Sequence, residues 1–310
     1  MPNSDRLIVK IIKEICEEQN YSLSLYSYDW IMRIRRAGCD KNMFIYGYQF
    51  PQNDLAAGEI CGDKAALYYV LADSGIPAAE HNFFMSPSNM HYIGEGGNWD
   101  RLCGLLDKHK KLVCKRNSGS GGGGVFIVRD KLELEKVTGE IFRSSRSMSV
   151  SPYYDIEDEF RVIVLCGEAR VVYRKIRPFV LGNGRDSVAA LAFIKFGAGF
   201  AEMDLDVNLA RVPAENETVC LNWKHNLGRG ASSEEIEDSP LKIKLTELSL
   251  KAAKYLDLNF VSVDIINANG HFMILEINSG IMMEKFAAAS PENYKKAKEL
   301  YSDAISKELF

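Results

Sequence analysis

Three oxygen-bearing side chains near the C-terminus have the types and the spacing to bind a metal ion. Asp264 lies in one hydrophobic run, and Glu276 and Asn278 lie two residues apart at the end of the next. Residues two apart on a strand point to the same face. Hard cations such as Mg²⁺ prefer carboxylate and amide oxygens, and substrate phosphates often complete the coordination shell. The segment therefore predicts a Mg²⁺ site, with a solvated hairpin end as the alternative.

The turn between the two runs decides whether the three groups share a face. Residues 267–270, Asn-Ala-Asn-Gly, predict a β-hairpin because Asn and Gly adopt positive φ at low cost. A two- or four-residue loop would pair Asp264 with Met273 and send the carboxylate to the opposite face. A three-residue loop, or a glycine bulge at Gly270, would pair Asp264 with Ile274 and unite all three groups. If they form one site, we expect an odd-membered or bulged turn.

A glycine-rich segment provides the second chemical signal. Residues 115–125 begin with Lys115 and contain an almost unbroken glycine run at 119–124, between two apolar stretches. Such a loop lets backbone N–H groups approach phosphate oxygens, while the lysine adds a positive charge. It is not a Walker loop, because it lacks the GK[ST] ending and a following helix. A flexible linker is the alternative, and a mobile lid over a nucleotide is the interpretation we favour. The predicted phosphate contacts within it are Ser120, Gly121, Gly122 and Gly123.

Three further groups gain meaning only in combination. Lys64 follows Asp63 at a helix start, although taken alone it would be a surface lysine. Glu159 begins a strand and could accept hydrogen bonds from a ribose, or it could belong to a solvated turn. Residues 222–230 mix cations, an amide and glycines, a composition that suits an anion. A basic surface loop is the alternative for this segment, and its His225 is either a general base or a hydrogen-bonding bystander.

Composition limits the class of protein. The chain has 310 residues, enough for two or three modest domains, and its 46% hydrophobic and 26% charged content is typical of a globular protein. The formal charge of -4 argues against general nucleic-acid binding. No run approaches the roughly 20 apolar residues that span a membrane, and the start lacks a signal peptide's pattern. Seven cysteines without a CxxC pair favour a reducing cytoplasm over a disulfide framework or a zinc site.

Hydrophobic periodicity predicts a mixed α/β chain. Helices are expected at 4–19, 30–36, 63–73, a segment ending near 109, 131–142, 187–196, 241–256 and 291–309. Strands are expected at 21–26, 43–46, 78–84, 112–115, 125–128, 148–154, 160–165 and 169–173, followed by the hairpin described above. The order of the first elements suggests a small β-α-β layer at the N-terminus. Residues 201–217 are expected to be irregular.

Taken together, these motifs resemble the ATP-grasp superfamily in order and spacing over roughly residues 55–285. In that family two lysines bind the ATP phosphates, an acidic residue binds the ribose, and a D…E-x-N hairpin binds two Mg²⁺ ions. The matching positions here are Lys64, Lys115, Glu159, Asp264, Glu276 and Asn278. The adenine-binding hinge maps loosely onto Ser151, Tyr153 and Tyr154.

Finer motifs resemble the carboxylate–amine ligases of this superfamily, namely cyanophycin synthetase, bifunctional glutathione synthetase and ribosomal-protein glutamate ligase. Residues 178–188 are similar to their P-x-V-x-GDG-x-x-TV stretch, and residues 212–230 to their VP…N-L-S-T-G-G segment. The chain departs from these patterns at several positions, which are Arg116, Asn183, Gly228 and Arg229. Ser262 stands where D-alanine–D-alanine ligases carry a substrate arginine.

The resemblance implies an α/β (α+β) ATP-grasp fold in three parts. These are an N-terminal domain at 1–62, a central lobe at 63–154 with the glycine lid, and a C-terminal lobe at 155–310 with the Mg²⁺ and substrate sites. It also implies ATP and two Mg²⁺ ions as cofactors, with Mn²⁺ as a possible substitute. The implied partners are a small-molecule carboxylate and an amine, either amino acid or peptide, with no nucleic acid or membrane. A homodimer is compatible with the resemblance.

The implied reaction joins the carboxylate to the amine through an acyl phosphate, releasing ADP and phosphate. Phosphoryl transfer depends mainly on positioning and charge neutralisation, so no nucleophilic side chain is required. The candidates for binding the acyl-phosphate oxygens and the substrate carboxylate are Arg174 or Lys175, together with Lys224, Asn226 and Arg229. A small-molecule kinase of the same superfamily, and a nucleotide-binding protein without catalysis, are the alternatives.

Overall fold

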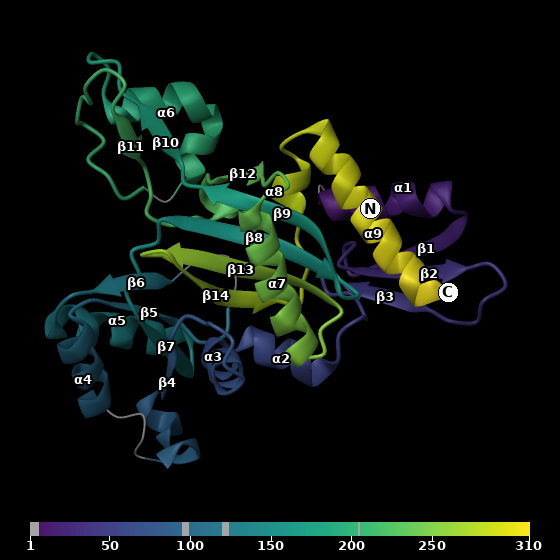
Figure 1. The fold of residues 1–310 in the computed structure, drawn as a ribbon, viewed down its shortest axis with the longest axis horizontal. Coiled ribbons are helices and arrows are strands. Elements are labelled where there is room, and N and C mark those ends of the chain that lie inside the picture. The colour runs from purple at the N-terminus through teal and green to yellow at the C-terminus, as the bar shows by residue number, and fades with distance from the viewer. Residues whose placement is uncertain (1–5, 95–98, 120–123, 204) are drawn as a thin grey trace.

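A computed structural model describes residues 6–94, 99–119, 124–203 and 205–310 of the chain. Two sheets with helical coverings form its centre, and a small layer of one helix and three strands lies at one end (Figure 1). In the described part of the chain, no helix is long and apolar enough to cross a membrane.

The N-terminal layer consists of a helix and an antiparallel meander. Its elements are α1 (Leu7–Glu18), β1 (Tyr21–Tyr26), β2 (Ile31–Arg36) and β3 (Met43–Tyr46). The predicted helix at 30–36 is wrong, and so is the β-α-β order. Met32 and Ile34 are buried while Arg35 is exposed, which is the two-residue period of a strand with one face in the core.

The C-terminal helix completes the core of this layer. Helix α9 (Pro291–Leu309) lies beside α1, and Leu300 and Ile305 join Ile8 and Ile12 in one hydrophobic cluster. Helix α8 (Glu284–Ala287) precedes α9, and the Glu284 carboxylate accepts hydrogen bonds from the first backbone N–H groups of α1. The N-terminal core contains residues from both ends of the chain. The predicted domain boundaries at residues 62 and 154 remain predictions.

A small four-stranded sheet carries one side of the candidate site. Its order is β4-β7-β5-β6, from β4 (Asn82–Met85), β5 (Leu112–Arg116), β6 (Val125–Val128) and β7 (Ser147–Pro152). Cys114, Met148 and Val150 face α4 (Trp99–His109) and α5 (Lys131–Ser144) in a hydrophobic cluster. Because side chains alternate along a strand, Lys115 and its cross-strand partner Ser149 point away from these helices.

A five-stranded sheet forms the other side of the site. Its order is β12-β9-β8-β13-β14, from β8 (Asp158–Leu165), β9 (Glu168–Ile176), β12 (Ser232–Glu235), β13 (Phe260–Ala268) and β14 (His271–Asn278). One face packs against α2 (Leu55–Gly62), α3 (Lys64–Asp73) and α7 (Pro240–Tyr255). The other face is apolar at one end, where Ile163 and Tyr173 join the N-terminal core, and charged at the opposite end.

A small excursion leaves the large sheet after β9. It contains the antiparallel pair of β10 (Phe179–Leu181) and β11 (Thr218–Cys220), with helix α6 (Val188–Phe196) and the 3₁₀ turn η3 (Gly197–Glu202) between them in the chain, around a core of its own. Two other 3₁₀ turns are η1 (Pro87–Tyr92) and η4 (Leu227–Arg229). As expected, residues after 202 up to β11 are irregular in the described part of this segment.

The β13–β14 hairpin reaches the expected grouping by an unexpected route. Its turn has two residues, because Ala268 pairs with His271. The strand pairing then shifts between Asp264 and Ile265, which leaves Leu275 as the extra residue of a β-bulge. The expected odd-membered turn, the bulge at Gly270 and the pairing of Asp264 with Ile274 are therefore wrong. Asp264 pairs with Glu276.

Candidate active site

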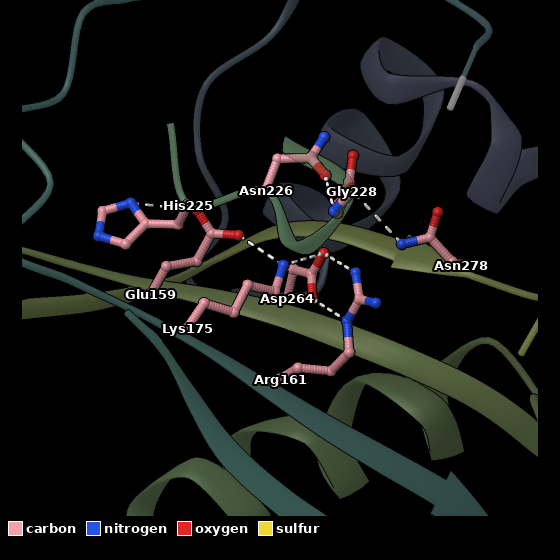
Figure 2. A network of polar contacts seen from close by, with 9 residues as sticks. Glu159, Arg161, Lys175, His225, Asn226, Gly228, Asp264 and Asn278 are labelled. Carbon is pink, nitrogen blue, oxygen red and sulfur yellow. Dashed lines mark hydrogen bonds and ion pairs between the residues drawn. The ribbon is translucent and has the colours of Figure 1, made fainter. Parts of the chain in front are cut away.

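Four charged side chains form a compact cluster on the large sheet. The Arg161 guanidinium donates from Nε and Nη2 to Oδ1 and Oδ2 of Asp264, both at 2.6 Å. The Lys175 ammonium lies 2.9 Å from Asp264 Oδ2 and donates to Glu159 Oε1 at 2.6 Å. Figure 2 shows the cations reaching the Asp264 carboxylate from two sides. The strand register explains the cluster, because Glu159 lies opposite Lys175 and Arg161 lies opposite Asp264.

The cluster compensates its own buried charges. Burial alone would raise the pKa of Asp264, but Arg161 and Lys175 hold it well below its ordinary value. Burial raises the pKa of Glu159, against the opposing effect of Lys175. The pKa of Lys175 is raised despite burial and nearby Arg161, because both carboxylates favour its charged form. A buried ion is tolerated only when it is paired in this way.

Glu276 and Asn278 extend this charged face toward the edge of the sheet. Glu276 lies directly opposite Asp264, and Asn278 lies opposite Ser262, so all three predicted metal ligands share one face. The Asn278 amide donates to Glu276 Oε1 at 3.3 Å. Unlike Asp264, both residues are only half-buried.

The donor set partly fits an oxygen-preferring cation. Glu276 and Asn278 present oxygens on one face, as Mg²⁺ or Mn²⁺ requires. Both Asp264 oxygens already accept hydrogen bonds from cations, so only the remaining lone pairs are available to a metal. Among the described residues, no group of three His, Cys, Asp or Glu side chains is placed to hold a metal.

Two lysines face this region, Lys64 from the start of α3 and Lys115 from β5 of the small sheet. The Lys64 ammonium donates to the carbonyl oxygens of Asn117 at 3.3 Å and Gly119 at 2.9 Å, at the entrance to the glycine segment. Burial lowers the pKa of Lys64, and burial lowers that of Lys115 to about 8. Glu276 opposes both shifts, so its carboxylate lies near both ammonium groups. Lys115 has no ion pair or hydrogen bond from its ammonium among the residues described.

The predicted adenine hinge and lid are placed in part. Ser151 is buried on the same face of β7 as Ser149. The Tyr153 ring lies under the Lys111 ammonium at 3.2 Å, and the Tyr154 hydroxyl accepts a hydrogen bond from the backbone N–H of Glu80 at 2.9 Å. Ser120, Gly121, Gly122 and Gly123 lie outside the described residues.

The substrate-binding candidates do not all converge. Arg174 points to the opposite face of the sheet from Lys175, where it lies 3.4 Å from Asp158 and over the Phe160 ring. Asn226 accepts a hydrogen bond from the backbone N–H of Gly228 at 2.8 Å, close to the cluster in Figure 2. Lys224 lies over the Trp223 ring, and Arg229 is exposed. Of the two alternatives Arg174 and Lys175, only Lys175 belongs to the cluster.

His225, just before η4, lies next to the charged cluster but forms no hydrogen bond with it. Its Nδ1 lies 3.7 Å from Glu159 Oε2, too far for a hydrogen bond, and has no partner among the described residues. Burial, with the charges of Arg177 and Lys175, lowers the pKa of His225 to about 3. The imidazole is therefore neutral at neutral pH.

Sequence reasoning missed two residues of this site. Arg161 lies two positions after Glu159 on the same strand, and this spacing could have placed it on the charged face. His81 left no such signal. It is buried, its Nδ1 lies 2.9 Å from Ser149 Oγ, and its Nε2 has no partner in the described structure. Burial, then the charges of Lys115 and Lys64, hold the pKa of His81 well below its usual value.

Comparisons with known proteins agree with this fold. Residues 191–297 match the RimK-like ATP-grasp domain. The tetrahydromethanopterin:alpha-L-glutamate ligase of Methanocaldococcus jannaschii is 25% identical over 174 residues, covering 56% of this chain and 47% of that protein. The cyanophycin synthetase of a Nostoc species is 30% identical over 138 residues, covering 43% of this chain and 14% of that protein. The chain thus spans less than half the length of these two relatives.

Solved structures extend the match to nearly the whole chain. A bifunctional glutathione synthetase from Pasteurella multocida superposes on 97% of this chain and 44% of its own, with a TM-score of 0.58 and 16% identity. A D-alanine–D-alanine ligase from Bacillus anthracis superposes on 82% of this chain and 67% of its own, with a TM-score of 0.53 and 20% identity. The predicted ATP-grasp fold is confirmed.

Proposed function

We propose that this chain, a member of the ATP-grasp superfamily with a RimK-like domain over residues 191–297, is an ATP-dependent carboxylate–amine ligase. The observation that carries the proposal is that Lys64 at the start of α3 and Lys115 on β5 both lie near Glu276, which stands opposite Asp264 on the large sheet. One buried and one half-buried lysine beside an oxygen-rich strand suit a polyphosphate with its metal ions. The names of the two relatives, a glutamate ligase and a synthetase, support the same class.

In the proposed reaction a substrate carboxylate oxygen attacks the γ-phosphorus of ATP. The bond between that phosphorus and the β–γ bridging oxygen breaks, leaving an acyl phosphate and ADP. The amine then attacks the carbonyl carbon, loses a proton and expels phosphate. Lys64 and Lys115 bind the transferring phosphates, and Lys175 stabilises charge on the phosphoryl oxygens from the opposite lobe. None of these steps needs a covalent bond to the protein.

The loop around η4 provides the proposed acyl site. Asn226 is fixed by its bond to the Gly228 N–H, so the turn has a defined shape next to the cluster. Lys224 and Arg229 add positive charge on either side of it. Together they suit the carboxylate of the first substrate.

Glu276 and Asn278 hold the proposed Mg²⁺, and Asp264 contributes where its lone pairs permit. Bound Mg²⁺ neutralises charge that develops on the phosphate oxygens. Two ions, with Mn²⁺ as a substitute, are part of this proposal. Glu159 is proposed to bind the ribose, which requires its bond to Lys175 to lengthen or to be shared.

The cellular setting is also proposed. All seven cysteines are free thiols, which suits a reducing cytoplasm. The substrates are proposed to be amino acids or peptides, without nucleic acid, and the chain could work as a homodimer.

The test is a screen of carboxylate and amine mixtures with Mg²⁺-ATP. A ligase releases inorganic phosphate only with both substrates, and the product mass equals their sum minus water. Lys64→Met serves as the inactive control. A product carrying a phosphoryl group would instead identify a kinase. Nucleotide binding without turnover across a broad substrate panel would favour the non-catalytic alternative.

A further inference from the structure

The N-terminal meander exposes a row of aromatic and arginine side chains. On its outer face, away from α1 and α9, the strands of the meander present Tyr26, Ile31, Arg33, Arg35, Phe44 and Tyr46, and the β1–β2 turn adds Tyr28 and Trp30. Tyr28 is 86% exposed, Tyr46 61% and Phe44 50%. We call this set the aromatic face.

The exposure is a property of one face only. The alternate residues Met32, Ile34, Met43 and Ile45 are buried in the core shared by α1 and α9. The inner side of the sheet is therefore packed in the core, and the stability of the fold does not require large aromatic rings on the outer side. Tyrosine, tryptophan, phenylalanine and arginine are the residues enriched in protein–protein interfaces and their energetic hot spots. Contiguous exposed apolar surface of this kind indicates a binding surface.

The face is held in a fixed shape. The Trp30 ring meets Tyr46 and Tyr48 edge-on, and the Arg6 guanidinium stacks on both Trp30 and Tyr48 at 4.4 and 4.8 Å. Three successive residues before Trp30, at positions 27–29, have positive φ between 53° and 65°. A left-handed backbone at three non-glycine positions is costly, and its result here is to display Tyr28 to solvent.

The charge on this face is positive, although the whole chain is acidic. Arg33 and Arg35 project from the outer face, no Asp or Glu lies on its three strands, and the β1–β2 turn contributes one acidic residue, Asp29. Arg33 Nη2 donates to Ser24 Oγ, while its buried Nε has no partner among the described residues. The formal charge of the chain is -4. Charge complementarity therefore favours an acidic partner.

We propose that the aromatic face binds an extended, acidic polypeptide segment that also carries apolar side chains. Strands β1 and β3 each pair only with β2 among the strands described. The outer edges of β1 and of residues 43–45 of β3 can therefore pair with an added strand, whereas Tyr46 already exchanges backbone hydrogen bonds with Gln49. Carboxylates of that segment pair with Arg33 and Arg35, and its apolar side chains pack against the rings. Binding here does not require the ligase activity proposed above.

The position of the face links it to the candidate active site. The chain leaves β3 through Tyr48, whose carbonyl oxygen accepts a hydrogen bond from Ile281 at 2.9 Å, and Gln49, which bridges to Gly280. Gly280 is two residues beyond Asn278. A segment bound along β3 therefore ends close to the strand that carries the proposed metal ligands.

The test measures binding of a fluorescent peptide of about ten residues, enough to cover a six-residue strand. Its sequence alternates Glu and Leu, and a matched peptide alternates Lys and Leu. We expect saturable binding of the Glu peptide that weakens with added salt, and little binding of the Lys peptide. Arg35→Glu and Phe44→Ser should each weaken binding about tenfold or more, the loss expected of interface hot spots.

Two matched variants on α7 serve as controls, because Lys254 and Tyr255 are exposed there away from the meander. Lys254→Glu and Tyr255→Ser should leave binding unchanged, and thermal unfolding should show that all four variants are folded. Absence of binding, equal binding of the Lys peptide, or equal losses in the α7 controls would overturn the proposal. So would preferred binding of a single-stranded oligonucleotide, or a dimer of the chain that Phe44→Ser dissociates.

Discussion

The large and small sheets differ in whether their charged side chains are paired within the protein. On the large sheet, Asp264 and Glu159 are paired with Arg161 and Lys175, so the cluster is complete without any ligand. On the small sheet, the Lys115 ammonium forms no ion pair among the described residues, and burial lowers its pKa to about 8 despite the nearby Glu276 carboxylate. The comparison teaches that the charges of the first cluster stabilise one another without a ligand, whereas the charge of Lys115 is left for an added anion.

The largest expected effect on stability comes from removing Asp264 from the paired charges of the large sheet. Asp264→Ala leaves two buried cations without their carboxylate, so the free energy of unfolding should fall by about 3–5 kcal/mol. Denaturant titration measures it. Glu276→Gln, on the same face but half-buried and without an ion pair among the described residues, should change stability by less than about 1 kcal/mol. Equal stability losses in the two variants would contradict the contrast.

Substitution of Lys115 on the small sheet should lower activity and leave stability largely unchanged. Lys115→Met removes a half-buried cation that forms no ion pair among the described residues, so stability should hold or rise. Substrate-dependent ADP release should fall about 10²–10³-fold, the cost of losing one electrostatic contact to a reacting group. Coupled-enzyme kinetics with parallel denaturant titration checks both. A stable fold with undiminished turnover would remove Lys115 from the site.

The depressed pKa of Lys115 predicts that stability and ATP affinity change in opposite directions as the pH rises. Between its folded value of about 8 and the ordinary 10.5, the folded state binds fewer protons than the unfolded state. The contribution of Lys115 to stability therefore rises with pH across that window. If Lys115 binds ATP as proposed, ATP prefers the protonated ammonium, so its affinity should fall up to about tenfold per pH unit above 8. Calorimetric titration of ATP measures the fall, and Lys115→Arg, which stays charged, should flatten it.

The smallest effect is expected where two adjacent cations lie on opposite faces. Arg174 and Asp158 form a partly exposed pair on the far side of the sheet from Lys175. Arg174→Met should change stability by less than about 1 kcal/mol and turnover by no more than about threefold. Lys175→Met should lose most turnover under the same assay. If the Arg174 variant also loses turnover, the assignment of faces is wrong.

The sequence predicted most helices and strands, because amphipathic periodicity and caps are local. The predicted strand 125–128, helix 291–309 and helix start at Asp63 agree with the structure, where Asp63 is the N-cap of α3. The segment at 30–36 was misjudged because Ile31 and Ile34, three residues apart, fit a helix turn as well as a short strand. The meander that decides between them pairs β2 with both neighbours, a non-local effect.

The candidate site was predicted through residue types but not through their pairing. Asp264, Glu159 and Lys175 are visible in the sequence, yet their mutual contacts depend on the register of three strands. His81 could not be found, because its role depends on Ser149 from a distant strand. The predicted ATP-grasp fold was confirmed, whereas the roles of the individual site residues remain predictions.

The bulge at Leu275 reverses the alternation of side-chain faces along β14. On the tip side, Ile274 faces the α7 core with Ile265, and on the base side Glu276 joins Asp264. If Leu275 instead took a regular place opposite Asp264, Glu276 would fall opposite Val263 and point into that hydrophobic core. The bulge therefore sets which face of the last strand is polar, through its backbone and not through the Leu275 side chain, so position 275 should accept many substitutions. Deleting Leu275 would leave Glu276 opposite Asp264 in a regular ladder and keep both faces, whereas closing the bulge with Leu275 still present would exchange the polar and apolar faces beyond it.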